Sequence, residues 1–244
     1  VFIKICGMTT SDAIHAAAAA GADAVGFVFA PSTRRVTPEG AAKLAEHLRA
    51  GVLKVAVTQH PEQSLVDEIC AALAPDCLQS DVEDFDELRL PSGLQRLPVL
   101  RANRERPKSL PPRILFEGPA SGVGRTGDWQ SAAELATRTE LILAGGLNAA
   151  NVADAIARVR PFGIDVSTGV ERTPGIKDPR KIEAEWYKRT GIYPFHGIIV
   201  VKDSVLKEHP WVAKSLFKAF TAAKERYVKN LPSPDKVSGK DKQM

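Results

Sequence analysis

The chain is poor in cysteine and holds no apolar run of membrane-spanning length. Its 244 residues include three cysteines, at positions 6, 70 and 77. An odd number of cysteines without framework spacing argues against structural disulfides, so we expect free thiols in a reducing, cytoplasmic compartment. The longest apolar stretch, residues 16–30, is broken by Asp23 and by glycines, which excludes a membrane span. No basic-then-apolar signal segment opens the sequence, and we expect no membrane partner.

Tyrosine is absent from the first 184 residues, and this absence marks a change of composition along the chain. Residues 185–244 carry all three tyrosines and eight of the fifteen aromatic side chains. They also hold 12 Lys and Arg against 6 Asp and Glu, whereas residues 1–184 hold 21 against 23. The shift indicates a junction between two pieces of different origin. Because the tail's lysines are spread among apolar residues, they predict a solvated helix face and no nucleic-acid partner.

The first 184 residues alternate between short apolar segments and helix-like segments. Overall, 44% hydrophobic and 25% charged residues are typical of a globular protein. Segments rich in Val, Ile, Leu and Phe predict strands covered on both faces. These strands are expected over residues 1–5, 24–29, 53–57, 77–79, 97–100, 113–116, 141–144 and 163–166. Helices are expected over residues 10–20, 37–49, 61–73, 129–137 and 149–159, with mostly loop over 98–113.

This alternation predicts an α/β protein, a compact (β/α)8 TIM barrel. An open doubly wound sheet is the alternative, but no G-x-G-x-x-G follows a strand near the front of the chain. The rhythm stops after Ala184, where the eighth helix is expected. A strand-like run at 197–201 and an amphipathic helix at 210–229 follow instead. We therefore expect three parts: a barrel over 1–184, a foreign-looking strand-helix extension over 185–230 and a disordered tail over 231–244.

Cys6 directly follows the first predicted strand and precedes a glycine. In a parallel barrel, the carboxyl ends of the strands face the mouth where chemistry is done. A cysteine in that position can act as a general base or a nucleophile when its thiolate is favoured. The alternative is a buried structural cysteine.

Glycine-bearing turns follow the seventh and eighth predicted strands. One is Gly145-Gly146 and the other is Ser167-Thr168-Gly169. The loops after these two strands often bind phosphate in barrels, because bare backbone amides and hydroxyls suit an anion. The sequence therefore predicts a phosphate site and a phosphorylated small molecule as the partner, although tight turns use glycine for other reasons as well.

Three charged residues complete the candidate site. Glu117 follows three large apolar residues, where poor solvation favours the protonated form of a general acid; the alternative is a surface carboxylate. Cys6 and Glu117 then flank the phosphate turns, as a base and an acid on opposite sides of a phosphorylated sugar. Arg34, in the loop after the second strand, can clamp a carboxylate or is merely solvated. Asp165 either serves the polar groups of the substrate or caps the phosphate turn.

In this order, the motifs of the chain resemble those of phosphoribosylanthranilate isomerases of tryptophan biosynthesis. They are KICGMT at 4–9, GADAVGFVF at 21–29, STRRV at 32–36, GVGRTGDW at 122–129, LAGGLN at 143–148, DVSTGVE at 165–171 and PGIKDP at 174–179. The resemblance covers about residues 1–183. It implies a (β/α)8 aldose–ketose isomerase, an intramolecular oxidoreductase without a cofactor or metal. The implied reaction is the Amadori rearrangement of N-(5'-phosphoribosyl)anthranilate to 1-(2-carboxyphenylamino)-1-deoxyribulose 5-phosphate.

The resemblance also implies a role for each candidate residue. Cys6 matches the general base that removes the proton from ribose C2. Glu117 stands where the family has an aspartate general acid that protonates the furanose oxygen. Arg34 matches the arginine near the anthranilate end, and Asp165 matches a substrate-site aspartate. The phosphate-binding turns of the family match Gly145, Gly146, Ser167, Thr168 and Gly169.

The chain departs from the family pattern in four places. Glu117 is one methylene longer than the usual aspartate, Gln79-Ser80-Asp81-Val82 stands where Gln-Leu-His-Gly is common, and Val123 replaces a threonine. From about Trp186 the chain instead resembles the C-terminal part of 4,5-dihydroxyphthalate decarboxylase-like and related solute-binding proteins, over residues 187–203 and 209–224. Three alternatives to an isomerase therefore stay open: an impaired phosphosugar-binding barrel, a barrel enzyme for another phosphosugar, and a chimeric chain with a solute-binding-protein-like tail. The oligomeric state stays open as well.

Overall fold

The computed structural model describes residues 1–107, 109–118, 128–182, 207–209, 211 and 215. Its main sheet consists of eight parallel strands in chain order, each four to seven residues long. They are β1 (Phe2–Cys6), β2 (Ala24–Val28), β3 (Leu53–Val57), β4 (Cys77–Asp81), β5 (Gln95–Arg101), β6 (Arg113–Glu117), β7 (Glu140–Leu143) and β8 (Gly163–Val166). All eight predicted strands are confirmed, and β1, β4, β5 and β6 end one or two residues later than expected.

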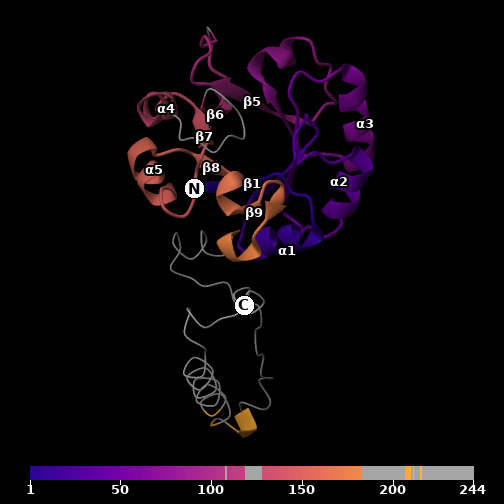
Figure 1. The fold of residues 1–244 in the computed structure, drawn as a ribbon, viewed down its shortest axis with the longest axis vertical. Helices are drawn as coiled ribbons and strands as arrows, with labels where there is room; N and C mark the ends of the chain where they lie inside the picture. Colours follow the sequence, from indigo (N-terminus) through magenta and orange to yellow (C-terminus); the bar gives the residue numbers. More distant parts are fainter. Residues whose placement is uncertain (108, 119–127, 183–206, 210, 212–214, 216–244) are drawn as a thin grey trace. The chain divides into compact units, whose positions relative to one another are not determined.

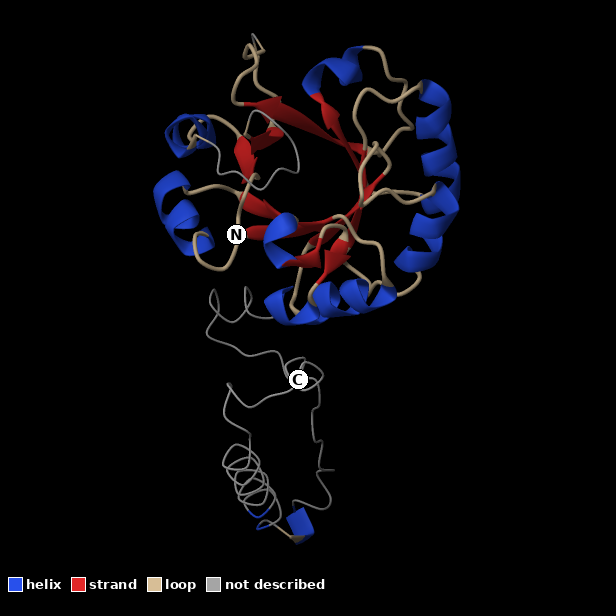
Figure 2. Cartoon of the chain, viewed as in Figure 1, coloured by secondary structure: helices blue, strands red, loops and turns tan. Residues whose placement is uncertain are grey.

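The sheet closes on itself, because β1 pairs with both β2 and β8. Figure 2 shows the strands as an inner ring with the helices outside it. This arrangement confirms the (β/α)8 barrel and excludes the open doubly wound sheet, in which the first and last strands would not meet. The carboxyl ends of all eight strands therefore open at one end of the barrel.

Five α-helices cover the outside of the ring within the described residues (Figure 1). They are α1 (Ser11–Ala19), α2 (Pro38–Ala45), α3 (Gln63–Leu73), α4 (Trp129–Ala136) and α5 (Val152–Val159). Side chains at the N-caps begin several of them; Thr37 accepts from the Gly40 amide in α2, and Asp128 accepts from two amides of α4. The five predicted helices are confirmed, with shorter ends.

Two connections lack an α-helix. A 3₁₀ helix, η1 (Val82–Asp86), joins β4 to β5, and the described residues between β5 and β6 hold no helix, as predicted. Prolines are frequent in that second connection, which includes Pro107, Pro111 and Pro112. Proline lacks the amide that a helix interior needs, so a loop follows.

Side-chain alternation along the strands creates two apolar layers. Residues such as Ile5, Ile114 and Leu143 point outward and pack in the layer that includes residues of the helices. Residues such as Val55, Leu115 and Ile142 form a separate cluster inside the barrel. Since successive strand residues face opposite sides, the last inward position of each strand lies at the barrel mouth.

A hairpin of β9 (Glu171–Thr173) and β10 (Ile176–Lys177) follows β8 and a short 3₁₀ helix, η2 (Thr168–Val170). Thr9 donates a hydrogen bond to the Gly175 carbonyl at 2.7 Å, which ties the hairpin to the loop after β1. Helical residues then begin at 179 and are described as far as Ile182, which is buried.

The chain divides into two compact units, residues 1–194 and residues 195–244. Within the second unit, the described helical residues are Lys207, Glu208, Trp211 and Ser215. Trp211 and Ser215 fall within the helix predicted over 210–229. The predicted strand at 197–201 and the rest of the predicted helix and tail lie outside the described residues. The boundary near residue 184 stays a prediction. Of the helices described, none is long and apolar enough to cross a bilayer.

Candidate active site

A cavity of about 250 Å³ opens at the carboxyl ends of the barrel strands. Its wall includes eight of the nine predicted site residues, namely Cys6, Arg34, Glu117, Gly145, Gly146, Asp165, Ser167 and Thr168. They come from the ends of β1, β6 and β8 and from the loops after β2, β7 and β8. Residues spread over more than 160 positions of sequence thus meet in one place.

A larger cavity, of about 820 Å³, reaches the opposite end of the barrel. Its wall includes the first residue of six strands, namely Phe2, Leu53, Cys77, Gln95, Arg113 and Glu140. Volume alone would favour it as the active site. However, parallel barrels carry their catalytic groups at the carboxyl ends, and the predicted residues gather there. We therefore assign the candidate active site to the smaller cavity.

Cys6 is the last residue of β1, and its side chain is buried inside the barrel. Lys4 precedes it by two positions, so both side chains point inward while Ile3 and Ile5 face the outer layer. Gly26 on β2 leaves room for both: a Cβ there would lie 2.9 Å from Cys6 Sγ and 3.2 Å from Lys4 Nζ. The glycine thus allows an ammonium group and a thiol to share one small space.

Lys4 is fully buried and forms an ion pair with Asp165 of β8. Its Nζ donates to Asp165 Oδ1 at 2.9 Å. Although burial by itself lowers the pKa of Lys4, Asp165 and Cys6 raise it above that of an ordinary lysine. Lys4 is therefore a permanent cation beside Cys6. The sequence suggested that Asp165 serves the substrate or caps the phosphate turn, and the structure adds a third role, that of counterion to Lys4.

The charge state of Cys6 is set by opposing effects. Burial raises the pKa of the thiol, and the Lys4 ammonium opposes that rise. Asp165 adds to the rise, while Lys177 lowers the pKa. In the absence of a ligand the thiol form therefore predominates at neutral pH. Cys6 therefore depends on the positive charges of Lys4 and Lys177 to lose its proton.

The two predicted phosphate turns lie side by side at the mouth. Gly145 and Gly146 have φ values of 93° and 63°, a backbone region that favours glycine. Gly169 lies outside the cavity wall and packs on the loop after β7, where an added Cβ would be 2.0 Å from the Leu147 carbonyl oxygen. Gly169 therefore keeps the two turns in contact, and Ser167 and Thr168 of the same turn line the cavity.

Lys177 of β10 holds the Ser167–Gly169 turn through hydrogen bonds to Ser167. Its Nζ is fully buried and donates to the Ser167 carbonyl at 3.0 Å, to Ser167 Oγ at 3.2 Å and to Glu171 Oε1 at 2.9 Å. Ser167 Oγ in turn donates to the Cys6 carbonyl at 3.1 Å. The hairpin after β8 is thus linked directly to the end of β1.

Arg34 is oriented by Glu171 rather than solvated. Its Nε and Nη2 donate to the two carboxylate oxygens of Glu171 at 2.6 and 2.8 Å. Against the effect of burial, Arg34 and Lys177 lower the pKa of Glu171. The side chain passes over Gly7, where an added Cβ would lie 2.6 Å from Arg34 Cδ. The bidentate pair fixes one edge of the guanidinium and leaves Nη1 for another partner.

Glu117 lies at the end of β6, as predicted, but its surroundings are polar. Arg101, at the end of β5, donates through Nη1 to Glu117 Oε1. Through Nη2 the same guanidinium donates to Asp81 Oδ1 of β4 at 2.6 Å. Glu117 is therefore shielded from solvent, as expected, but it is paired with a cation and is not a surface carboxylate. It belongs to a partly buried chain of charges.

Four residues of the site were not among the predicted ones: Lys4, Lys177, Glu171 and Arg101. The first three stand inside the motifs at 4–9, 165–171 and 174–179, and Lys4 could have been found from its inward position two residues before Cys6. Arg101 lies one residue beyond the predicted fifth strand. Gln79 also lines the cavity, and its Oε1 is buried with no hydrogen-bond partner among the described residues, so it offers an acceptor to a ligand.

The fold and the site together define a (β/α)8-barrel enzyme with acid, base and anion-binding candidates at the carboxyl ends of its strands. A sequence profile described as N-(5'phosphoribosyl)anthranilate (PRA) isomerase matches residues 3–185. The chain belongs to this isomerase family of tryptophan biosynthesis, as its sequence motifs indicated.

Similar proteins agree with this assignment. The N-(5'-phosphoribosyl)anthranilate isomerase of Mesorhizobium japonicum is 40% identical over 200 residues, which cover 74% of this chain and 91% of that protein. The phosphoribosyl anthranilate isomerase of Thermus thermophilus has a TM-score of 0.69 at 27% identity, over 78% of this chain and 99% of that one. A third phosphoribosyl anthranilate isomerase was solved in complex with reduced 1-(o-carboxyphenylamino)-1-deoxyribulose 5-phosphate. It is 30% identical to this chain with a TM-score of 0.66, over 79% of this chain and 100% of that one.

Proposed function

We propose that the chain isomerises N-(5'-phosphoribosyl)anthranilate to 1-(2-carboxyphenylamino)-1-deoxyribulose 5-phosphate, with the groups of the smaller cavity as its catalytic machinery. The observation that supports this most is the convergence of Cys6, Glu117, Arg34 and Asp165 with the two glycine turns around that cavity. A relative with 30% identity binds a reduced product analogue. The substrate is accordingly a phosphorylated small molecule.

The reaction needs two proton transfers. A general acid protonates the furanose oxygen, which opens the ring and leaves a Schiff base between C1 and the anthranilate nitrogen. A general base then removes the proton from C2, and the electrons of that bond form the enolamine, which tautomerises to the ketone. No electron leaves the substrate, so we propose that the protein's own acid and base suffice without a cofactor.

Cys6 is the proposed base. Its thiolate removes the C2 proton, and the permanent charge of Lys4 stabilises that thiolate. Asp165 supports the assignment by holding Lys4 Nζ at 2.9 Å inside the barrel. The positive charge of Lys177 also lowers the pKa of the same thiol.

Glu117 is the proposed acid, and its place in the wall of the same cavity as Cys6 supports this assignment. The proton it supplies goes to the furanose oxygen. Its carboxyl contacts Arg101 while the side chain lines the cavity.

The remaining groups hold the substrate. We propose that the amides of Gly145, Gly146 and the Ser167–Gly169 turn bind the phosphate. Arg34, whose Nη1 is left by the Glu171 pair, binds the anthranilate carboxylate. Binding at these two ends orients the ribose between acid and base.

The test is consumption of phosphoribosylanthranilate by the purified chain, followed by the loss of its fluorescence. We expect Cys6→Ser and Glu117→Gln each to lower kcat by about 10²- to 10⁴-fold, the usual contribution of an acid or base. Cys70→Ser is the matched control, because Cys70 lies on α3 away from the cavity. Wild-type activity in both variants would refute the roles. Phosphate binding without turnover in the unmodified chain would favour a phosphosugar-binding barrel.

Two further proposals concern the cellular compartment and the extent of the catalytic unit. Cys6, Cys70 and Cys77 are free in the structure, which supports a reducing, cytoplasmic setting. We further propose that residues 1–184 form the catalytic unit and that residues 185–244 are an extension to it. The family match, which ends at residue 185, supports this boundary.

A further inference from the structure

Three consecutive strands end in charged residues that contact one another. Asp81 ends β4, Arg101 ends β5 and Glu117 ends β6. Arg101 bridges the two carboxylates, and the three side chains are only 9%, 5% and 12% exposed for Arg101, Asp81 and Glu117. A buried guanidinium held from both sides has little freedom to leave either partner.

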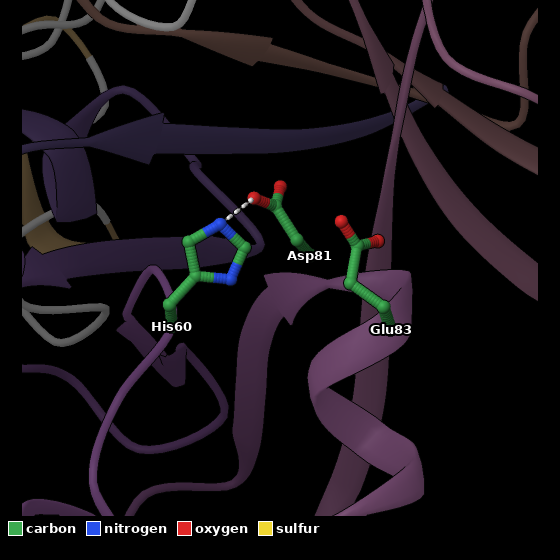
Figure 3. Close-up of side chains that lie close together, drawn as sticks. All are labelled: His60, Asp81 and Glu83. Carbon is green, nitrogen blue, oxygen red and sulfur yellow. Dashed lines mark ion pairs between the residues drawn. The ribbon is translucent and has the colours of Figure 1, made fainter.

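Asp81 is anchored in turn from the loop after β3. His60 Nε2 lies 3.4 Å from Asp81 Oδ2, and Figure 3 shows this pair with Glu83 beside it. Asp84 accepts from the other ring nitrogen at 2.7 Å and raises the pKa of His60. Asp81 therefore has partners on both sides, and Arg101 sits in a fixed position between β4 and β6.

We propose that Arg101, anchored by Asp81, is a positioning residue for Glu117: it fixes the carboxyl at the cavity wall and favours its ionised form. The inference rests on the proposed function, in which Glu117 is the general acid. It goes beyond that function because it assigns Glu117 a cationic partner that holds the carboxyl in place and opposes its protonation.

The strands around Glu117 bring several other charged groups to the cavity. Arg101 faces it from β5, and Asp81 lies behind Arg101 on β4. From β1 and β8 the cavity receives Cys6 and Asp165, with Lys4 beneath them. The described end of β7 contributes Ala144 and glycines, which carry no charge. Arg101 is in direct ion-pair contact with Glu117.

This arrangement has a distinctive kinetic consequence. The active form needs protonated Glu117 and ionised Cys6. However, Arg101 favours the ionised form of Glu117, and burial favours the protonated form of Cys6. The kcat/KM profile of such an enzyme is still bell-shaped, but its rising limb belongs to the acid and its falling limb to the base. Removal of Arg101 must therefore move the rising limb to higher pH.

The experiment measures kcat/KM against pH for the wild type, Arg101→Met, Arg101→Lys and Asp81→Asn. In R101M, we expect the rising limb to move up by about one to three pH units, the usual effect of an adjacent arginine on a carboxyl. In R101K, the limb stays near that of the wild type because the charge is kept, while kcat falls at least about tenfold because a point charge cannot bridge two carboxylates. In D81N, the limb moves to lower pH, because the Asp81 carboxylate no longer offsets the charge that Arg101 presents to Glu117.

Arg113→Met is the matched control. Arg113 also pairs with a glutamate, Glu140, at 2.6 Å, but it does so at the other end of the barrel. We expect its profile to coincide with that of the wild type. A rising limb in R101M within about 0.3 units of the wild type, or an equal shift in R113M, would overturn the proposal. D81N and R101K keep the test decisive if R101M fails to fold.

Glu117→Gln separates this proposal from the one it rests on. If E117Q loses activity while the R101M limb stays in place, Glu117 is the acid and Arg101 does not govern it. If E117Q retains wild-type activity, the acid role itself is wrong. Loss of activity in E117Q together with the upward shift in R101M supports both.

Discussion

Lys4→Met removes the cation on which the proposed base depends, and its cost in stability follows from the structure. Lys4 is fully buried and pairs with Asp165, which is itself 9% exposed. Methionine fills a similar volume but leaves the Asp165 carboxylate without its partner. Removing one member of a buried pair costs about 3–5 kcal/mol, because the remaining charge is uncompensated. We expect a loss of that size in the free energy of unfolding.

The same substitution changes the chemistry at Cys6. Lys4 is the group that most opposes the effect of burial on the thiol, so its removal raises the pKa of Cys6 further. At a fixed neutral pH, each additional unit reduces the thiolate fraction about tenfold. We therefore expect kcat/KM of K4M at neutral pH to fall at least about tenfold, with the limb that belongs to Cys6 displaced to higher pH.

Urea titration and the fluorescence assay measure the two effects separately. In the double variant Lys4→Met with Asp165→Asn, no unpaired charge is left, so most of the lost stability returns while activity does not. Lys54→Met is the control, because Lys54 Nζ contacts the Leu73 carbonyl rather than a carboxylate. If K4M unfolds within about 1 kcal/mol of the wild type, or if its pH profile coincides with the wild type, the reasoning fails.

Three shorter predictions concern the thiols, the phosphate turn and the arginine pair. Burial raises the pKa of Cys77 from 9.0 to about 11, so the folded state holds its proton longer than the unfolded state. Stability is then unaffected below pH 9 and falls by about 2–3 kcal/mol as pH rises to about 11; urea titrations at both ends should show this slope reduced in Cys77→Ala. Gly169→Ala forces the Leu147 carbonyl away and should raise both KM and the inhibition constant of inorganic phosphate at least about tenfold, whereas Gly40→Ala in α2 should change neither. Glu171→Gln frees Arg34 and Lys177, so KM should rise more than kcat falls in steady-state kinetics; an unchanged KM would contradict the Arg34 assignment.

The barrel could be predicted because its signals are local. Each strand is a short apolar segment bounded by polar residues, and order along the chain equals order around the ring. Strand ends were less certain, since polar residues such as Asp81, Arg101 and Glu117 interrupt the apolar pattern where a strand reaches the mouth. Since these strand ends carry the site's polar side chains, the apolar pattern that predicts strands stops at the functional positions.

The reactive groups could also be predicted, but their partners could not. Cys6 and Glu117 follow from strand-end positions. The pairing of Lys4 with Asp165 joins residues 161 positions apart, and it depends on the closure of β1 against β8. Sequence spacing holds no information on such contacts. Alternation would still have indicated that Lys4 and Cys6 share the inner face of β1, because Ile3 and Ile5 occupy the outer one.

The charges of the described site residues balance in groups, and this decides how an anionic substrate is held. Lys4 pairs with Asp165, Arg34 and Lys177 share Glu171, and Arg101 lies between Asp81 and Glu117. Four cations thus face four carboxylates, so the substrate meets little net positive charge from these side chains. The phosphate must then gain much of its binding energy from backbone amides, whose dipoles need no counterion. This is why the approach of Gly169 to the Leu147 carbonyl matters as much to the proposed function as any charged residue.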